Sequence, residues 1–210
     1  MRLKSATERA VEATIENGDV VRMHLLRPTW HFVARKDVRW VLELTEPNIR
    51  LAMKYRDRQL QLTDETVRKS NRIIEKTLRA GPVTRDRLVS ALEAGGIANY
   101  DNRAAHLLMR AELDKVACSA PPLKGKQAYV FFDAWIPPAK PLRKEEALVA
   151  LAQRYFSTLA CDLAGFLLVV WFIFEGCAQR AGGGEGKLYG REDRLADLGF
   201  VDVFQASRCF

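Results

Sequence analysis

The chain has 210 residues, of which 48% are hydrophobic and 28% are charged, and it carries a net charge of +7 with a pI near 9.4. This hydrophobic content is sufficient for folded cores and excludes a disordered protein. Residues 1–158 hold 28 basic and 19 acidic side chains, so the positive excess belongs to this part of the chain and favours a polyanionic partner.

Cysteine usage and the N-terminal residues exclude several classes of protein. The four cysteines (Cys118, Cys161, Cys177 and Cys209) form no CxxC pair and have no histidine at ligand spacing. Neither a zinc site nor a disulfide framework is therefore expected, and reduced thiols indicate the cytosol. Residues 1–8 lack the apolar segment of a secretion signal. We expect a cytoplasmic protein with no membrane partner, no metal and no small-molecule cofactor.

Residues 1–60 are predicted to contain a helix, two strands and an amphipathic helix. The expected bounds, in chain order, are Ala6–Ile15, Val20–Met23, Thr29–Val33 and Arg35–Thr45. Asn17-Gly18-Asp19 is expected to stop the first helix. Pro47 is expected to close or restart the amphipathic helix, because proline lacks a backbone donor.

Residues 61–140 are predicted to form one complete winged helix. The expected elements are a helix over Thr63–Ala80, a second helix from Thr84 to Leu92 that Gly95-Gly96 ends, a third helix over Asp101–Val116, and a hairpin. Thr84 is expected to accept free amide hydrogens at the start of its helix. The order helix, turn, helix, wing is typical of DNA-binding proteins in which a recognition helix enters the major groove.

The helix over Asp101–Val116 is predicted to have an apolar face and a basic face. The apolar residues are Ala104, Leu107, Leu108 and Ala111, and the basic residues are Arg103, His106 and Arg110. We expect the apolar face to pack and the basic face to be free to meet a partner.

The hairpin after this helix is predicted to carry lysines at its tip. Ala117–Ala120 looks extended, Pro121–Lys126 turns the chain, and Gln127–Phe132 returns as a β-branched and aromatic strand. Lys124 and Lys126 suit phosphate contacts, which fix register without reading sequence. For any single lysine or arginine, the alternative is a solvated surface side chain.

A nine-residue string near the N-terminus carries a family resemblance. The string LLRPTWHFV at residues 25–33 resembles the signature of a bacterial winged-helix DNA-binding family related to AlkZ and YcaQ, DNA glycosylases that unhook alkylated bases and interstrand crosslinks. Leu107–Asp114, Gly125–Gln127 and Glu145–Phe156 resemble the same family. The resemblance covers about residues 1–158.

The resemblance implies tandem winged helices around a DNA groove. Residues 1–60 would be a partial first domain, 61–140 a complete second domain and 141–158 the start of a third. The expected fold class is α+β, mostly helical, with tandem winged helix-turn-helix domains and small β-hairpin wings. The resemblance also places Arg27, Thr29 and His31 near DNA. For His31 the alternative is a strand histidine that hydrogen-bonds a neighbouring loop.

The chain departs from the family pattern near its start. Family members begin well before the point that Met1 matches, and the glycosylases carry a catalytic Gln-x-Gln or Gln-x-Asp motif in that upstream portion. Here Gln59-Leu60-Gln61 lies after the Arg27 signature instead, and we interpret it as a solvated pair. We therefore expect a fragment of the family without catalytic residues.

The pattern also changes after Thr158. The family continues with a segment resembling HWPATLQDFxWWSGL, whereas this chain has the apolar run Gly165–Phe174, which is too short to span a bilayer. Moving the reading frame forward by one base permits the family segment over residues 158–174 and a second family-like segment over 176–188. Our hypothesis is that residues 159–210 are translated out of frame. The alternative is a buried apolar helix followed by a flexible linker.

The sequence predicts a DNA-binding tandem winged-helix protein without catalysis of its own, with double-stranded DNA as its partner, located in the nucleoid. The predicted contact residues are Arg27, Thr29, His31, Arg103, His106, Arg110, Lys124 and Lys126. The alternative is a DNA repair glycosylase, or a remnant of one, that acts on alkylated or crosslinked bases. A third interpretation is a winged-helix protein that binds only other proteins.

Overall fold

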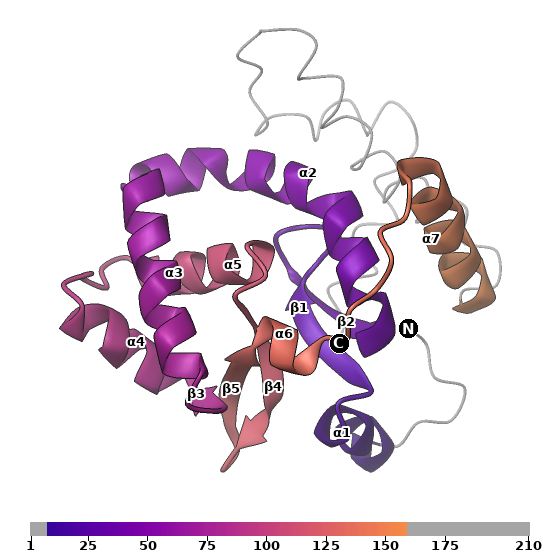
Figure 1. Ribbon diagram of the computed structural model, residues 1–210, viewed down its shortest axis with the longest axis horizontal. Coiled ribbons are helices and arrows are strands. Elements are labelled where there is room, and N and C mark those ends of the chain that lie inside the picture. Colours follow the sequence, from indigo (N-terminus) through magenta and orange to yellow (C-terminus); the bar gives the residue numbers. More distant parts are fainter. Residues whose placement is uncertain (1–7, 159–210) are drawn as a thin grey trace, which may run out of the picture. The chain divides into compact units, whose positions relative to one another are not determined.

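The computed structural model describes residues 8–158, and the predictions for residues 159–210 lie outside this range (Figure 1). Its elements are α1 (Glu8–Glu16), β1 (Val20–His24), β2 (Trp30–Ala34), the 3-10 helix η1 (Arg35–Asp37), α2 (Val38–Gln59), α3 (Asp64–Leu78), β3 (Val83–Thr84), α4 (Arg85–Ala94), α5 (Arg103–Leu113), β4 (Ala117–Leu123), β5 (Lys126–Phe131), α6 (Phe132–Trp135) and α7 (Lys144–Thr158). Helices predominate and the strands form small antiparallel sheets. This is the α+β, mostly helical and winged-helix-like fold class that the sequence predicts.

The first hairpin forms as predicted, but the helix after it is longer. β1 and β2 pair antiparallel from Val20 opposite Ala34 to His24 opposite Trp30. The prediction that Pro47 closes or restarts the helix is wrong, because α2 runs through it to Gln59. Proline removes only the hydrogen bond to the carbonyl four residues earlier, at the exposed Glu43, where water can replace the missing donor.

The helices α3, α4 and α5 pack together beside a three-stranded sheet. The sheet has the order β3-β5-β4, so that the short β3 pairs with the second strand of the hairpin. Thr63 caps α3 by accepting a hydrogen bond from the Thr66 amide at 3.2 Å. Thr84 precedes α4 as predicted, but its side chain makes no capping hydrogen bond and its backbone belongs to β3. Helix, strand, helix, helix and hairpin therefore follow one another in a winged-helix-like order.

The β4–β5 hairpin turns later than predicted. The turn was expected over Pro121–Lys126, but β4 continues through both prolines to Leu123. Only Lys124 and Gly125 separate the strands, and both have positive φ, 51° and 73°, as a two-residue type I′ turn requires. The pairing is irregular between Ala120 and Leu123, because the two prolines between them have no N–H to donate. This tight turn presents the tip of the hairpin to solvent.

Two hydrophobic cores hold the described chain together. One lies within residues 61–140 and includes Ile74 and Tyr129. The other joins Met23 of β1 and Leu42 of α2 to Phe132 of α6. Since this second core crosses residue 60, the first hairpin and α2 are packed onto the second hairpin. The division into domains at residues 60 and 140 stays a prediction.

The two hairpins have the same geometry relative to the helices that precede them. Val20 pairs with Ala34 in the first, and Ala117 pairs with Phe131 in the second, so adding 97 to each residue number converts one register into the other as far as Ala120, where the second hairpin becomes irregular. The same shift relates the C-terminal ends of α1 and α5. The described chain therefore contains an internal repeat of a helix followed by a hairpin.

The turns that lead from helix to hairpin are also equivalent. The Gly18 amide donates to the carbonyl of Ile15 at 3.0 Å, and the Lys115 amide donates to the carbonyl of Glu112 at 3.1 Å. Both donors have positive φ, 72° and 57°. At residue 18 only glycine fits, because a Cβ would lie 2.4 Å from the Trp135 ring. The repeat is thus set by backbone geometry and carries different side chains in its two copies.

A buried polar pair fixes the first hairpin to α5. Glu112, which is fully buried, accepts hydrogen bonds from the His24 amide at 3.0 Å and from His24 Nδ1 at 2.8 Å. The Trp30 ring lies over the His24 ring with centroids 4.0 Å apart, and the Arg22 guanidinium lies 4.4 Å from the centroid of Trp30. Because a buried carboxylate is costly without partners, this pair favours one position of the hairpin on α5.

Candidate nucleic-acid interface

Four of the predicted contact residues lie at the tips of the two hairpins. Arg27 and Thr29 belong to the tip of the first, and Lys124 and Lys126 to the tip of the second; all four are exposed. The shift of 97 residues brings Arg27 onto Lys124 and Thr29 onto Lys126. Within residues 8–158 neither Arg27 nor Lys124 forms an ion pair, whereas Lys126 Nζ lies 2.9 Å from Asp86 Oδ2. The repeat therefore places a cation at corresponding tip positions.

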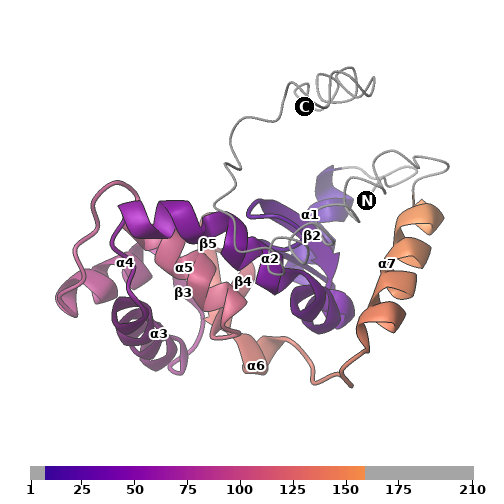
Figure 2. The same ribbon diagram turned by 90° about the horizontal axis from the view of Figure 1, so that it is seen from above.

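The two hairpins lie side by side, but their tips lie at opposite ends of the contact (Figures 1 and 2). His24, next to the first tip, forms hydrogen bonds with Glu112 of α5 just before the second hairpin, whereas Val20 at the start of the first hairpin lines a cavity with Gly125 of the second tip. β1 of the first hairpin contacts β4 of the second.

The ion pair between Lys126 and Asp86 is about two-thirds exposed on both partners. Its hydrogen bond raises the pKa of Lys126 and lowers the pKa of Asp86. Solvent-exposed pairs of this kind contribute little to stability and are easily exchanged for another anion.

His31 is a half-buried strand residue with an intramolecular partner. Its Nδ1 lies 2.8 Å from the carbonyl oxygen of Thr29, which is the loop hydrogen bond considered as the alternative for this residue. Burial lowers the pKa of His31, which favours the neutral ring. Its contact with DNA stays a prediction.

Arg103 is held against the end of α2. Its guanidinium donates to the carbonyl oxygens of Leu60 at 3.1 Å and Gln61 at 3.2 Å, and it lies 5.2 Å from the centroid of the Tyr100 ring. The last carbonyls of a helix have no partner within the helix and carry partial negative charge, which a cation stabilises. The structure thus gives Arg103 a capping role, while a phosphate contact stays a prediction.

His106 and Arg110 face an acidic residue of α2. Arg110 Nη1 lies 3.2 Å from Asp57 Oδ2, and His106 Nδ1 lies 4.0 Å from Asp57 Oδ1. The exposed fractions are 16% for Arg110, 21% for His106 and 11% for Asp57. Burial raises the pKa of Asp57, and burial lowers the pKa of His106. The expectation that this face of the helix is free is therefore wrong, because α2 covers it.

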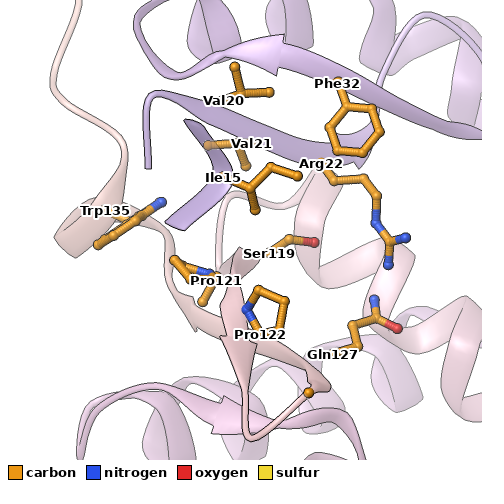
Figure 3. A pocket seen from close by; sticks show the side chains of 12 residues that line it. Ile15, Val20, Val21, Arg22, Phe32, Ser119, Pro121, Pro122, Gln127 and Trp135 are labelled. Carbon is orange, nitrogen blue, oxygen red and sulfur yellow. The ribbon is translucent and has the colours of Figure 1, made fainter. Parts of the chain in front are cut away.

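The structure also brings together side chains that the sequence analysis did not select. Arg22 of β1, Phe32 of β2 and Gln127 of β5 line a cavity between the two hairpins (Figure 3). Alternation along β1 could have identified Arg22, since Val21 and Met23 on either side of it are buried. Gln127 could not be identified in this way, because it reaches the cavity only through the packing of one hairpin on the other. No local pattern in the sequence predicts that packing.

Two further features bear on the kind of site. Among the described residues, no group of three or more histidine, cysteine, aspartate or glutamate side chains is arranged to hold a metal ion. Within the same range no helix has both the length and the apolar composition that crossing a membrane requires. The candidate site consists of basic, aromatic and amide side chains.

Comparison with known proteins assigns the chain to a family. The model of the AlkZ-like DNA glycosylase family matches residues 1–161. The chain belongs to this family. The fold resembles that of the DNA glycosylase AlkZ from Streptomyces sahachiroi with a TM-score of 0.58 and 15% sequence identity, over 73% of this chain and 43% of that chain. No curated protein sequence matches.

The family assignment confirms the resemblance that the sequence analysis drew from residues 25–33 and from the later segments. The AlkZ-like chain spans less than half of the Streptomyces protein that it matches in structure, and at 15% identity this likeness concerns the fold alone.

Proposed function

We propose that this AlkZ-like chain binds double-stranded DNA through the tips of its two hairpins and takes part in DNA repair. The observation that supports the proposal best is the pair of exposed cations, Arg27 and Lys124, at corresponding positions of two hairpins that lie side by side. Neither is neutralised by a described residue. A duplex presents phosphates on both sides of a groove, and separated cations can contact them together.

The net charge is consistent with this mode of binding. The nine excess positive charges of residues 1–158 attract a polyanion over the whole surface, and phosphate contacts at the tips then fix its position. Thr29 and Lys126 occupy the second pair of corresponding positions and complete the proposed tips. In this proposal the hairpins contact the DNA instead of the α5 face, where His106 and Arg110 face Asp57 of α2 and Arg103 donates to the carbonyls that follow α2.

The proposal is for binding without base excision by this chain, and a single titration tests both parts. The full chain is titrated with a plain duplex and with an alkylated duplex between about 50 and 200 mM salt, and released base is measured in the same samples. We expect affinity to fall steeply with salt and no base to be released. Release of base would support a glycosylase, and absence of binding at low salt would indicate a protein partner instead.

A further inference from the structure

A cavity of about 260 Å³ lies between the two hairpins. Figure 3 shows Phe32 and Arg22 on the side of the first hairpin and Gln127 on the side of the second. Most of the remaining wall is apolar, with contributions from Ile15 and Trp135 among others. The volume is slightly below the roughly 300–1,000 Å³ of pockets that hold drug-sized ligands. A single compact ring system would therefore fill it.

An exposed aromatic ring forms part of the wall. Phe32 is 49% exposed, and Arg22, which pairs with it across the hairpin, lines the same cavity. An exposed phenylalanine beside a cavity lacks the stabilisation that burial of its apolar surface would provide. Its ring face is available for stacking against a planar ligand.

The polar groups of the cavity are few and held in place. The Arg22 guanidinium lies 4.4 Å from the centroid of Trp30, and within residues 8–158 it forms no ion pair. Gln127 donates from Nε2 to Tyr129 Oη at 2.9 Å, and the buried hydroxyl of Ser119, which also lines the cavity, has no hydrogen-bond partner among the described residues. A ligand in the cavity would thus meet the Arg22 guanidinium, the Gln127 amide and the Ser119 hydroxyl.

We propose that this cavity receives a single unstacked nucleobase of the bound DNA. A nucleobase is planar, has two apolar faces and carries donors and acceptors only at its edge, which is the chemistry that Phe32, Arg22 and Gln127 offer together. The cationic tip of the second hairpin, whose Gly125 lines the cavity, would hold the flanking backbone beside it. This inference rests on the proposed DNA binding and adds the part of the DNA that the cavity recognises.

A backbone phosphate fits the cavity less well than a base. Arg22 is the one charged side chain among the residues that line it, and the rest of the wall is mainly apolar. A phosphate in such surroundings would lose most of its hydration for a single cation. The base is therefore the occupant that the lining favours.

A duplex with one bulged base tests the inference, because an unpaired base costs less to take out of the stack than a paired one. The full chain should bind the bulged duplex roughly tenfold more tightly than the fully paired duplex, which corresponds to about 1.4 kcal/mol and lies within the range for a base stacked on an aromatic ring. Phe32→Ala should abolish this preference, and Phe32→Tyr should retain it. Leu123→Ala, at an exposed apolar residue outside the cavity, is the matched control and should also retain it.

A second readout separates insertion of the base from a preference for bent DNA. With 2-aminopurine as the bulged base, binding should shield it from quenching by acrylamide, and Phe32→Ala should remove the shielding. Equal affinity for both duplexes, or a Phe32→Ala variant that keeps preference and shielding, would overturn the inference while leaving DNA binding intact. Absence of binding to either duplex would instead refute the proposed function on which the inference depends.

Discussion

The basic residues at the hairpin tips and those on α5 have the same chemistry but different surroundings. Arg27 and Lys124 are exposed and form no ion pair within the described chain. Arg110 and His106 face Asp57, with exposed fractions of 16% and 21%. A cation that already has a buried partner must lose it before it can meet a phosphate, and that loss costs free energy. The two regions therefore differ in whether their basic side chains are available to contact a phosphate, and not in the type of residue.

This difference assigns different functions to the two sets. The α5 cations tie α5 to α2, so their removal should affect folding before it affects binding. The hairpin cations contribute little to packing, so their removal should affect binding before it affects folding.

Removal of the acidic partner on α2 should have the largest effect. Asp57→Ala leaves Arg110 mostly buried without its ion pair, and we expect the free energy of unfolding to fall by about 2–3 kcal/mol. Chemical denaturation measures the change. Asp86→Asn, which removes the acidic partner of the exposed Lys126, is the matched control and should leave the unfolding midpoint nearly unchanged. Equal midpoints for the two variants would contradict a structural role for the α5 face.

The same control variant should strengthen binding to DNA. Lys126 is paired with Asp86 in the free chain, and Asp86→Asn releases this lysine and removes a negative charge from the hairpin side of the molecule. We expect the affinity for a duplex at moderate salt to rise about two- to threefold, since one more cation can contact a phosphate. Fluorescence anisotropy at two salt concentrations measures it. An unchanged or lower affinity would place Lys126 outside the interface.

The smallest effect is expected from mild acid. Burial lowers the pKa of His106 in the folded chain, so the unfolded chain binds a proton there at a higher pH than the folded chain does. The contribution to stability is complete above pH 6.5 and falls as the pH drops through this value. His106→Gln should reduce the loss of stability between pH 7 and pH 5.5, as followed by thermal unfolding. A variant with the same pH dependence as the parent chain would assign the loss to other groups.

Much of the fold could be predicted from the sequence because its signals are local. The extended runs of β1 and β2 and the helical spacing of α5 each depend on a few neighbouring residues. Pro47 misled the prediction because packing on both sides of α2 outweighs one missing hydrogen bond. The turn of the second hairpin was predicted to start too early in the chain, because two prolines usually mark a turn. In the structure both prolines lie in β4, an irregular edge strand.

The candidate site was only partly predictable, for a physical reason. Lys124 and Arg27 could be found because hairpin tips are exposed wherever the hairpin packs. The partners of Arg110 and Arg103 could not be found, because Asp57 and the carbonyls just after α2 lie more than 40 positions away in the chain. The cavity between the hairpins likewise depends on the contact between β1 and β4.

The most direct test of the hairpin interface is the salt dependence of duplex binding by the full chain and by its Arg27→Ala/Lys124→Ala double variant. If these two cations contact phosphates, the slope of log affinity against log salt should become shallower by about two units, while the unfolding midpoint stays unchanged. An Arg103→Ala variant should lower the unfolding midpoint and leave the slope close to that of the parent chain. A double variant with the parent slope would contradict the assignment of DNA binding to the hairpin tips.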